Sequence, residues 1–204
     1  MAVRDWLQRI IGSGSDAKSG AASSLPVARP AKTSPGRDEV IAYAVNLSGL
    51  VIDQPEAIAF YQATFKDHPT RFVTYDDLRK QGDLLDKASL KALGLRANVK
   101  LSAQFLATLN DRGRGDPLGA ASVIGLAIST ALSTLRDLGD MEAAGIDRAK
   151  FHASDMAAGP CAAAAKLDGK TIPVSGAPML PFETCTHPDQ CACFYQAWLE
   201  GLDD

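Results

Sequence analysis

Three of the chain's four cysteines and one of its three histidines lie within nine positions near the C-terminus, in the segment CTHPDQCAC. Thiolate sulfur and imidazole nitrogen are the ligands that zinc prefers in structural sites. Cys191 and Cys193 are separated by one residue, so an extended backbone directs both side chains to the same side. The fourth cysteine, Cys161, lies 24 positions before Cys185. The pattern predicts that Cys161, Cys185, Cys191 and Cys193 hold one structural Zn²⁺, with His187 as an alternative ligand.

Two other interpretations of these cysteines are a disulfide framework and a set of buried thiols. The first residues of the chain carry charges and no uninterrupted apolar run, so they are not a secretory signal, and we expect a cytoplasmic protein. Thiols are reduced in that compartment, which disfavours a disulfide framework. The spacing C-x23-C-x5-C-x-C is not that of a standard zinc finger. Buried thiols that pack as small apolar side chains therefore stay an open alternative to zinc.

No catalytic residue is predicted. The sequence has neither the H-E-x-x-H pattern nor the H-x-E and P-C-x-x-C patterns of catalytic zinc sites. The histidines His68, His152 and His187 are far apart, and no Ser-His-Asp set can be assembled from spacing. The alternative is an enzyme whose site lies between the helical part and the C-terminal part and uses Cys161 or His152. A single rapidly alkylated thiol would favour that alternative.

The elements that position the cysteines begin with a helical domain, predicted for residues 39–144. Its first segment, EVIAYAVNLSGLVI, fits a strand or a short buried helix equally. Beyond it, capping residues and glycine stops punctuate the sequence, and the segment NDRGRGD is expected to be a turn. These signals predict helices at residues 55–66, 75–81, 87–93, 99–109 and 117–144.

The last of these helices raises the question of a membrane. Residues 118–135 carry no charge, and this run is long enough to suggest a transmembrane span. Much of the run is Ala, Gly, Ser and Thr, and no aromatic belt or one-sided cluster of cations flanks it. We therefore expect no transmembrane span and predict the central helix of a compact helical domain.

The sequence changes in character after Gly145. The segments IDRAKFHAS and GKTIPV predict strands, and APMLP is a connector that cannot continue a helix. Residues 145–204 are predicted to form a small cysteine-rich, zinc-ribbon-like cap that contains β-structure. The fold class expected for the chain is a mainly α-helical domain with this C-terminal cap and a flexible N-terminal linker.

Residues 1–11 predict an amphipathic helix, because their apolar side chains recur at helical spacing. Residues 12–38 are rich in Gly, Ser, Ala and Pro and predict a disordered linker. A helix on a tether is typical of a docking segment, so we expect a protein partner that accepts its apolar face, with membrane contact at most peripheral and weak. The alternative is a helix that folds back onto its own domain. The predicted docking face comprises Val3, Trp6, Leu7, Ile10 and Ile11.

The charge balance argues against one class of partner. The formal net charge is −3 and the isoelectric point is about 5.6. Lysines and arginines between Lys87 and Arg114 are accompanied by aspartates in and beside that range. Because binding to a phosphate backbone requires clustered and uncompensated cations, no nucleic-acid partner is predicted.

The C-terminal part also carries a resemblance. The segments AAGIDRAKFHAS, LDGK and APMLP occur in order with the cysteines, and the last two cysteines form C-A-C-x-Y. This tail resembles a group of uncharacterised bacterial proteins with a C…LxG…P-LP…C…CxC-x-Y pattern and, more distantly, the C-terminal module of the Mu F-like phage head-morphogenesis (minor head) proteins. The resemblance implies a module that the cysteines close. Matching positions are Gly145, Phe151, Cys161, Leu167, Gly169, Lys170, Pro178, Leu180, Pro181, Cys185, Cys191, Cys193 and Tyr195.

These features together predict a non-enzymatic adaptor or assembly protein, a zinc-stapled helical domain with a tethered docking helix. The distant resemblance implies an alternative role as a phage or prophage minor head protein.

Overall fold

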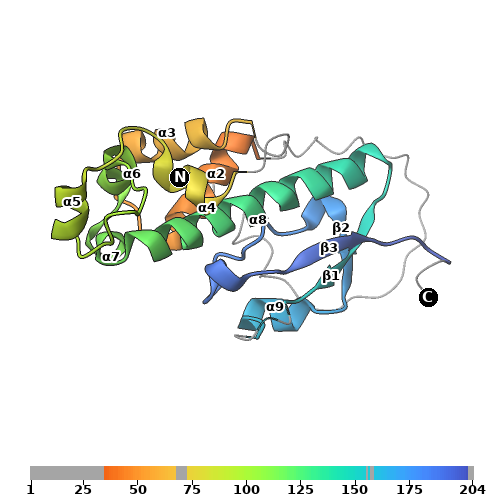
Figure 1. The fold of residues 1–204 in the computed structure, drawn as a ribbon. Helices are drawn as coiled ribbons and strands as arrows, with labels where there is room; N and C mark the ends of the chain where they lie inside the picture. Colours follow the sequence, from red (N-terminus) through yellow and green to blue (C-terminus); the bar gives the residue numbers. More distant parts are fainter. Residues whose placement is uncertain (1–34, 68–72, 155, 157–158, 202–204) are drawn as a thin grey trace. The chain divides into compact units, whose positions relative to one another are not determined.

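A computed structural model describes residues 35–67, 73–154, 156 and 159–201. The predicted docking helix, residues 1–11, and most of the predicted linker lie outside these ranges. The described residues all belong to one compact unit. The described residues are mainly helical and include a small three-stranded sheet, as the sequence predicts in outline (Figure 1).

The first helix, α2, spans Arg37–Ser48. The segment EVIAYAVNLSGLVI therefore begins as a helix rather than a strand, and α2 starts two residues before the predicted start of the helical domain at residue 39. The carboxylate of Glu39 accepts a hydrogen bond from the Gly36 amide at 3.1 Å, which supports the first turn. Gly49 ends the helix with a left-handed φ of 63°, a conformation that favours glycine.

Three helices begin where their capping residues predict: α3 (Pro55–Thr64), α4 (Tyr75–Lys80) and α5 (Lys87–Ala92). The capping box of α4 is complete. The Thr74 hydroxyl accepts from the Asp77 amide at 3.1 Å, and the Asp77 carboxylate accepts from the Thr74 amide at 3.1 Å. The ends of these helices lie one or two residues before the predicted ends.

The prediction for residues 99–109 is wrong at its start. Helix α6 spans Ala103–Thr108, because the Ser102 hydroxyl caps it by accepting from the Phe105 amide at 3.1 Å. The residues before Ser102 form a loop instead, and the Leu85 amide donates to the Leu101 carbonyl oxygen at 2.8 Å.

The segment NDRGRGD is helical rather than a turn. Helix α7 spans Asp111–Gly115, and the Asn110 side chain accepts from the Gly113 amide at 3.0 Å. A Cβ at Gly113 would lie 2.5 Å from the carbonyl oxygen of Leu50. This glycine therefore allows two backbone segments to approach closely.

The central helix, α8, spans Pro117–Ala143, close to its predicted bounds. The Asp116 carboxylate caps it by accepting from the Gly119 amide at 3.0 Å. By length and composition α8 would reach across a membrane, and half of its most apolar window is buried inside the structure. It packs against α2, α4 and α7 (Figure 1). Its fully or almost fully buried side chains include Ala120, Ala121, Ile124, Ala127, Ile128, Ala131 and Leu132.

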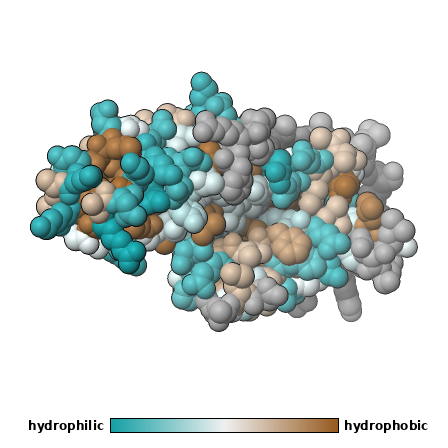
Figure 2. Space-filling view, viewed as in Figure 1, coloured by the Kyte–Doolittle hydropathy of each residue, from teal (hydrophilic) through white to brown (hydrophobic). Residues whose placement is uncertain are grey.

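Two clusters of buried apolar side chains stabilise the described residues. The first, the helical core, joins α2–α6 to the N-terminal two thirds of α8. Its large members Tyr61, Phe65 and Phe105 are fully buried, and the Tyr61 hydroxyl is hydrogen-bonded to the Thr108 hydroxyl at 2.7 Å. Exposed apolar side chains on this part of the chain are scattered among hydrophilic ones (Figure 2).

The C-terminal part contains an antiparallel sheet of order β2-β1-β3. Strands β1 (Arg148–His152) and β2 (Thr171–Pro173) confirm the two strands that the sequence predicts. Strand β3 (Phe194–Ala197) and helix α9 (Ala162–Leu167) are not among the predicted elements. Short 3-10 turns, η1 (Val174–Gly176) and η2 (Pro188–Gln190), complete this part.

The second cluster, the C-terminal core, places the inner face of the sheet against the last turns of α8. Phe151 of β1 and Tyr195 of β3 face each other with ring centroids 5.5 Å apart. Contacts also extend back along the helix, because the Thr130 hydroxyl donates to the Cys191 carbonyl oxygen at 3.4 Å. The C-terminal part thus lies along the second half of α8.

Candidate metal centre

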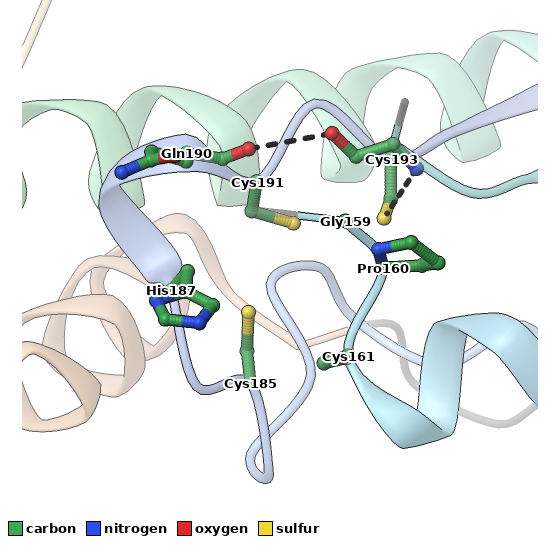
Figure 3. Close-up of a pocket in the computed structure, with 9 residues that line it drawn as sticks. Gly159, Pro160, Cys161, Cys185, His187, Gln190, Cys191 and Cys193 are labelled. Atoms are coloured by element: carbon green, nitrogen blue, oxygen red, sulfur yellow. Dashed lines mark hydrogen bonds between the residues drawn. The ribbon is translucent and has the colours of Figure 1, made fainter. Parts of the chain in front are cut away.

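The four cysteines line one small pocket in the C-terminal part (Figure 3). The structure therefore brings together all five residues that the sequence proposes as zinc ligands, including the alternative ligand His187. The pocket is lined by Ser154, Gly159, Pro160, Cys161, Cys185, His187, Gln190, Cys191 and Cys193.

The cysteines reach the pocket from three separate segments. Cys161 is the N-cap residue of α9. Cys185 follows a turn in which its amide donates to the Phe182 carbonyl oxygen at 2.8 Å. Cys191 follows η2, and Cys193 immediately precedes β3. In the described part of the chain, regular structure at the site is limited to the start of α9, the start of β3 and the short 3-10 turn η2, so the loops largely set the positions of the thiols.

Hydrogen bonds from outside the loops hold the segment around Cys191. Thr130 of α8 donates to the Cys191 carbonyl oxygen, and the Ser154 hydroxyl donates to the Gln190 carbonyl oxygen at 3.4 Å. The amide of Ser154 donates to the Cys193 sulfur at 3.3 Å. Donors of this kind orient a sulfur ligand and stabilise its anionic form.

The thiols also interact with one another. Hydrogen bonding by the Cys191 thiol lowers the pKa of Cys185 to about 6 and the pKa of Cys193 to about 7. The same hydrogen bonds raise the pKa of Cys191 itself. Burial raises the pKa of Cys161, which also interacts with Cys185. Two of the four sulfur atoms are thus biased towards the thiolate, the form that binds a metal ion.

The four cysteine side chains and His187 line the same pocket, but they are not arranged around a common metal position. Among the residues that the structure describes, no three His, Cys, Asp or Glu side chains are already arranged to hold an ion. Cys193 is buried, whereas Cys161, Cys185 and Cys191 are partly exposed. Convergence on one ion therefore requires rotation of these side chains. The chemistry of the donors, four sulfur atoms and one imidazole, fits zinc.

The two residues of the predicted alternative enzyme do not share this site. His152 lies on β1 and is not among the residues that line the pocket. Its ring stacks on Phe194 with centroids 4.8 Å apart, and its Nε2 atom is buried with no hydrogen-bond partner in the described part of the chain. Cys161 alone of the two faces the pocket.

No sequence pattern marks the residues that support the cysteines. Ser154 is an ordinary small polar residue just after strand β1, and Thr130 is another in the middle of α8. Their roles depend on contacts across 36 and 61 positions of sequence, which no local pattern records.

A comparison of the chain with protein-family models, with curated proteins and with solved structures finds no match in any of the three.

Proposed function

We propose that the chain is a non-enzymatic adaptor or assembly protein, in which a structural Zn²⁺ staples the C-terminal part and an N-terminal helix recruits a protein partner. The observation that carries this proposal is the single pocket lined by four cysteines from three segments. A structural zinc site needs four soft ligands around one ion, and cysteine side chains carried by loops can supply them.

The ligands proposed are Cys161, Cys185, Cys191 and Cys193, with His187 able to replace one of them. Four protein ligands occupy all the coordination positions of a tetrahedral zinc ion, so no position is open for water or a substrate. The proposed role of the ion is therefore to hold the fold, and the ion takes no part in a reaction.

Regular secondary structure around the site is sparse, which supports a stabilising role. Strands β1, β2 and β3 have five, three and four residues, and α9 has six. Small domains with such limited regular structure commonly depend on a metal or a disulfide for stability. An ion at the pocket would join α9 to the loop before β3 and fix that loop beside α8.

The recruiting element proposed is residues 1–11. Trp6 is the largest side chain of the predicted apolar face, which it shares with Val3, Leu7, Ile10 and Ile11, and a tryptophan of this kind often dominates the energy of a helix-in-groove contact. These residues lie outside the part of the chain that the structure describes, so the proposal rests on their sequence pattern.

The test compares the full chain with a Trp6→Ala variant and with a Gln8→Ala variant, whose change lies on the opposite face of the predicted helix. We expect Trp6→Ala to weaken partner capture by at least about 2 kcal/mol in free energy of association and Gln8→Ala to leave it unchanged. The measurement is quantitative pull-down from lysate, accompanied by a thermal melt of each variant. An unchanged set of partners together with a lowered melting temperature for Trp6→Ala would show that the helix folds back onto its own domain.

A further inference from the structure

The thiols of the pocket form a chain of neighbours. Cys161, Cys185, Cys191 and Cys193 all line one small pocket, and electrostatic interactions couple Cys161 to Cys185, Cys185 to Cys191, and Cys191 to Cys193. Sulfur atoms that line one small pocket need only a short movement to form a covalent S–S bond. The pocket therefore contains three candidate disulfide pairs.

The backbone disfavours one of these pairs. Cys191 and Cys193 are one residue apart, and an extended backbone separates their Cα atoms by about 6.6 Å, at the upper limit for a disulfide. Cys193 is also buried at 7 % exposure, and the Ser154 amide is bonded to its sulfur. This pair is poorly placed for reaction with an oxidant.

The pair of Cys161 and Cys185 is restrained at one end. Cys161 caps α9, and its carbonyl oxygen accepts from the Ala165 amide at 2.9 Å. Cys185 and Cys191, by contrast, flank a five-residue loop and are both partly exposed. A small oxidant in solvent therefore reaches this pair more readily than a pair that includes the buried Cys193.

We infer that hydrogen peroxide joins Cys185 and Cys191 in a disulfide and thereby displaces the zinc ion, so that the pocket is a peroxide-responsive site. This inference rests on the proposed zinc site and names its regulation. In the zinc-bound form, the ion would join the three segments that carry the cysteines. In the oxidised form, the disulfide closes only the loop between Cys185 and Cys191.

The chemistry balances with peroxide as the oxidant. One thiolate attacks the peroxide O–O bond, which gives a sulfenic acid and releases hydroxide, protonated to water. The second thiolate attacks the sulfenic sulfur, forms the S–S bond and expels a second hydroxide, also protonated to water. The two thiolates together lose two electrons, and peroxide gains them. The oxidation state of Zn²⁺ does not change. The ion is released because two of its four ligands no longer bind it.

The experiment uses the full chain, purified reduced, in one sample loaded with zinc and in another stripped of it. Each sample is treated with hydrogen peroxide, and free thiols are then alkylated. Cleavage before aspartate places Cys161, Cys185 and the Cys191–Cys193 segment on three different peptides. A Cys161–Cys185 bond and a Cys185–Cys191 bond therefore link different peptides, whereas a Cys191–Cys193 bond stays within one peptide and lowers its mass by two hydrogens. Released zinc is measured with a colorimetric chelator.

We expect linked peptides that contain Cys185 and Cys191, loss of alkylation at these two thiols together, and release of one zinc ion per chain. A Cys193→Ser variant should still form the link, and a Cys191→Ser variant should not. A zinc-loaded chain that forms no link, or that links Cys161 to Cys185 or Cys191 to Cys193, overturns the inference and leaves the zinc site standing. A chain that binds no zinc overturns the proposed function, and its stripped sample still shows whether peroxide joins the pair.

Discussion

The helical part and the C-terminal part of the chain bury their apolar side chains on very different scales. Among the described residues, the helical core contains twenty buried side chains, and several of them are large and fully inaccessible. The C-terminal core contains ten, one of which is the thiol of Cys193. The free energy gained by burial rises with the apolar area removed from water, so the smaller core gains less from packing.

The difference indicates what stabilises each part of the chain. Side-chain caps start most of the helices, at Thr74, Asp86, Ser102, Asn110 and Asp116, and apolar faces then pack them together. The C-terminal part has short strands and loops that meet at the cysteine pocket. On this account, the helical part is stabilised by burial, and the C-terminal part depends on a bound ion as well. The following predictions separate the two contributions.

The largest expected effect is in the helical core. Phe105 is fully buried and lies 6.4 Å from Phe60 between ring centroids. Phe105→Ala should lower the free energy of unfolding by about 3–5 kcal/mol, because it removes a large buried ring and leaves a cavity. Urea denaturation followed by circular dichroism measures this loss, and it should be the same with and without a zinc chelator.

Leu126 on α8 provides a matched control, because it is 46 % exposed. Leu126→Ala should change the free energy of unfolding by less than about 0.5 kcal/mol. Equal losses for the buried and the exposed position would contradict the assignment of the helical core.

The second prediction concerns the pocket. Cys191→Ser should lower the free energy of unfolding of the C-terminal part by about 3 kcal/mol when zinc is present, because structural zinc binding contributes directly to folding. In the presence of chelator the variant and the unchanged chain should be nearly equal in stability. The unfolding of this part can be followed by the fluorescence of Trp198, which directly follows β3. The Lys150 ammonium group lies over the Trp198 ring, 5.8 Å from its centroid.

A Trp6→Phe background removes the other tryptophan and makes that signal specific. A loss for Cys191→Ser that persists undiminished in chelator would show that the thiol acts through packing alone.

The smallest effect expected is at a contact between the two parts. The Tyr43 hydroxyl of α2 donates to the Pro181 carbonyl oxygen at 2.6 Å, and burial raises the pKa of this phenol. Tyr43→Phe should lower stability by about 1 kcal/mol, since it leaves a partly buried carbonyl without its donor. Thermal denaturation of the variant measures the loss; an unchanged melting temperature would mean that the contact adds nothing to the docking of the C-terminal part.

The sequence predicts the helical part well, because its signals are local. A cap and a glycine stop are each defined by a few neighbouring residues, as at Thr74 and Gly49. The start of α6 was missed because the apolar pattern continues through Leu101, and the Ser102 cap decides the boundary. Helix α7 was missed because two glycines in five residues are typical of a turn.

The C-terminal part is less predictable, because its elements are short and their partners are distant. Strand β3 has four residues and pairs with β1 across more than forty positions. The residue types of the pocket could be chosen from the sequence, since cysteines are rare in it and three of the four are close together. The supporting donors Ser154 and Thr130 could not, because only the folded chain brings them to the loop.

The central claim is that the pocket holds one zinc ion on cysteine sulfur, and X-ray absorption at the zinc edge of the purified full chain tests it most directly. We predict one zinc per chain with a shell of sulfur atoms at about 2.3 Å, four in number, or three with one nitrogen if His187 replaces a cysteine. Cys191→Ser should reduce the sulfur shell or abolish binding. A chain that retains no zinc after purification in zinc-containing buffer, or a zinc shell made only of nitrogen and oxygen, would contradict the account.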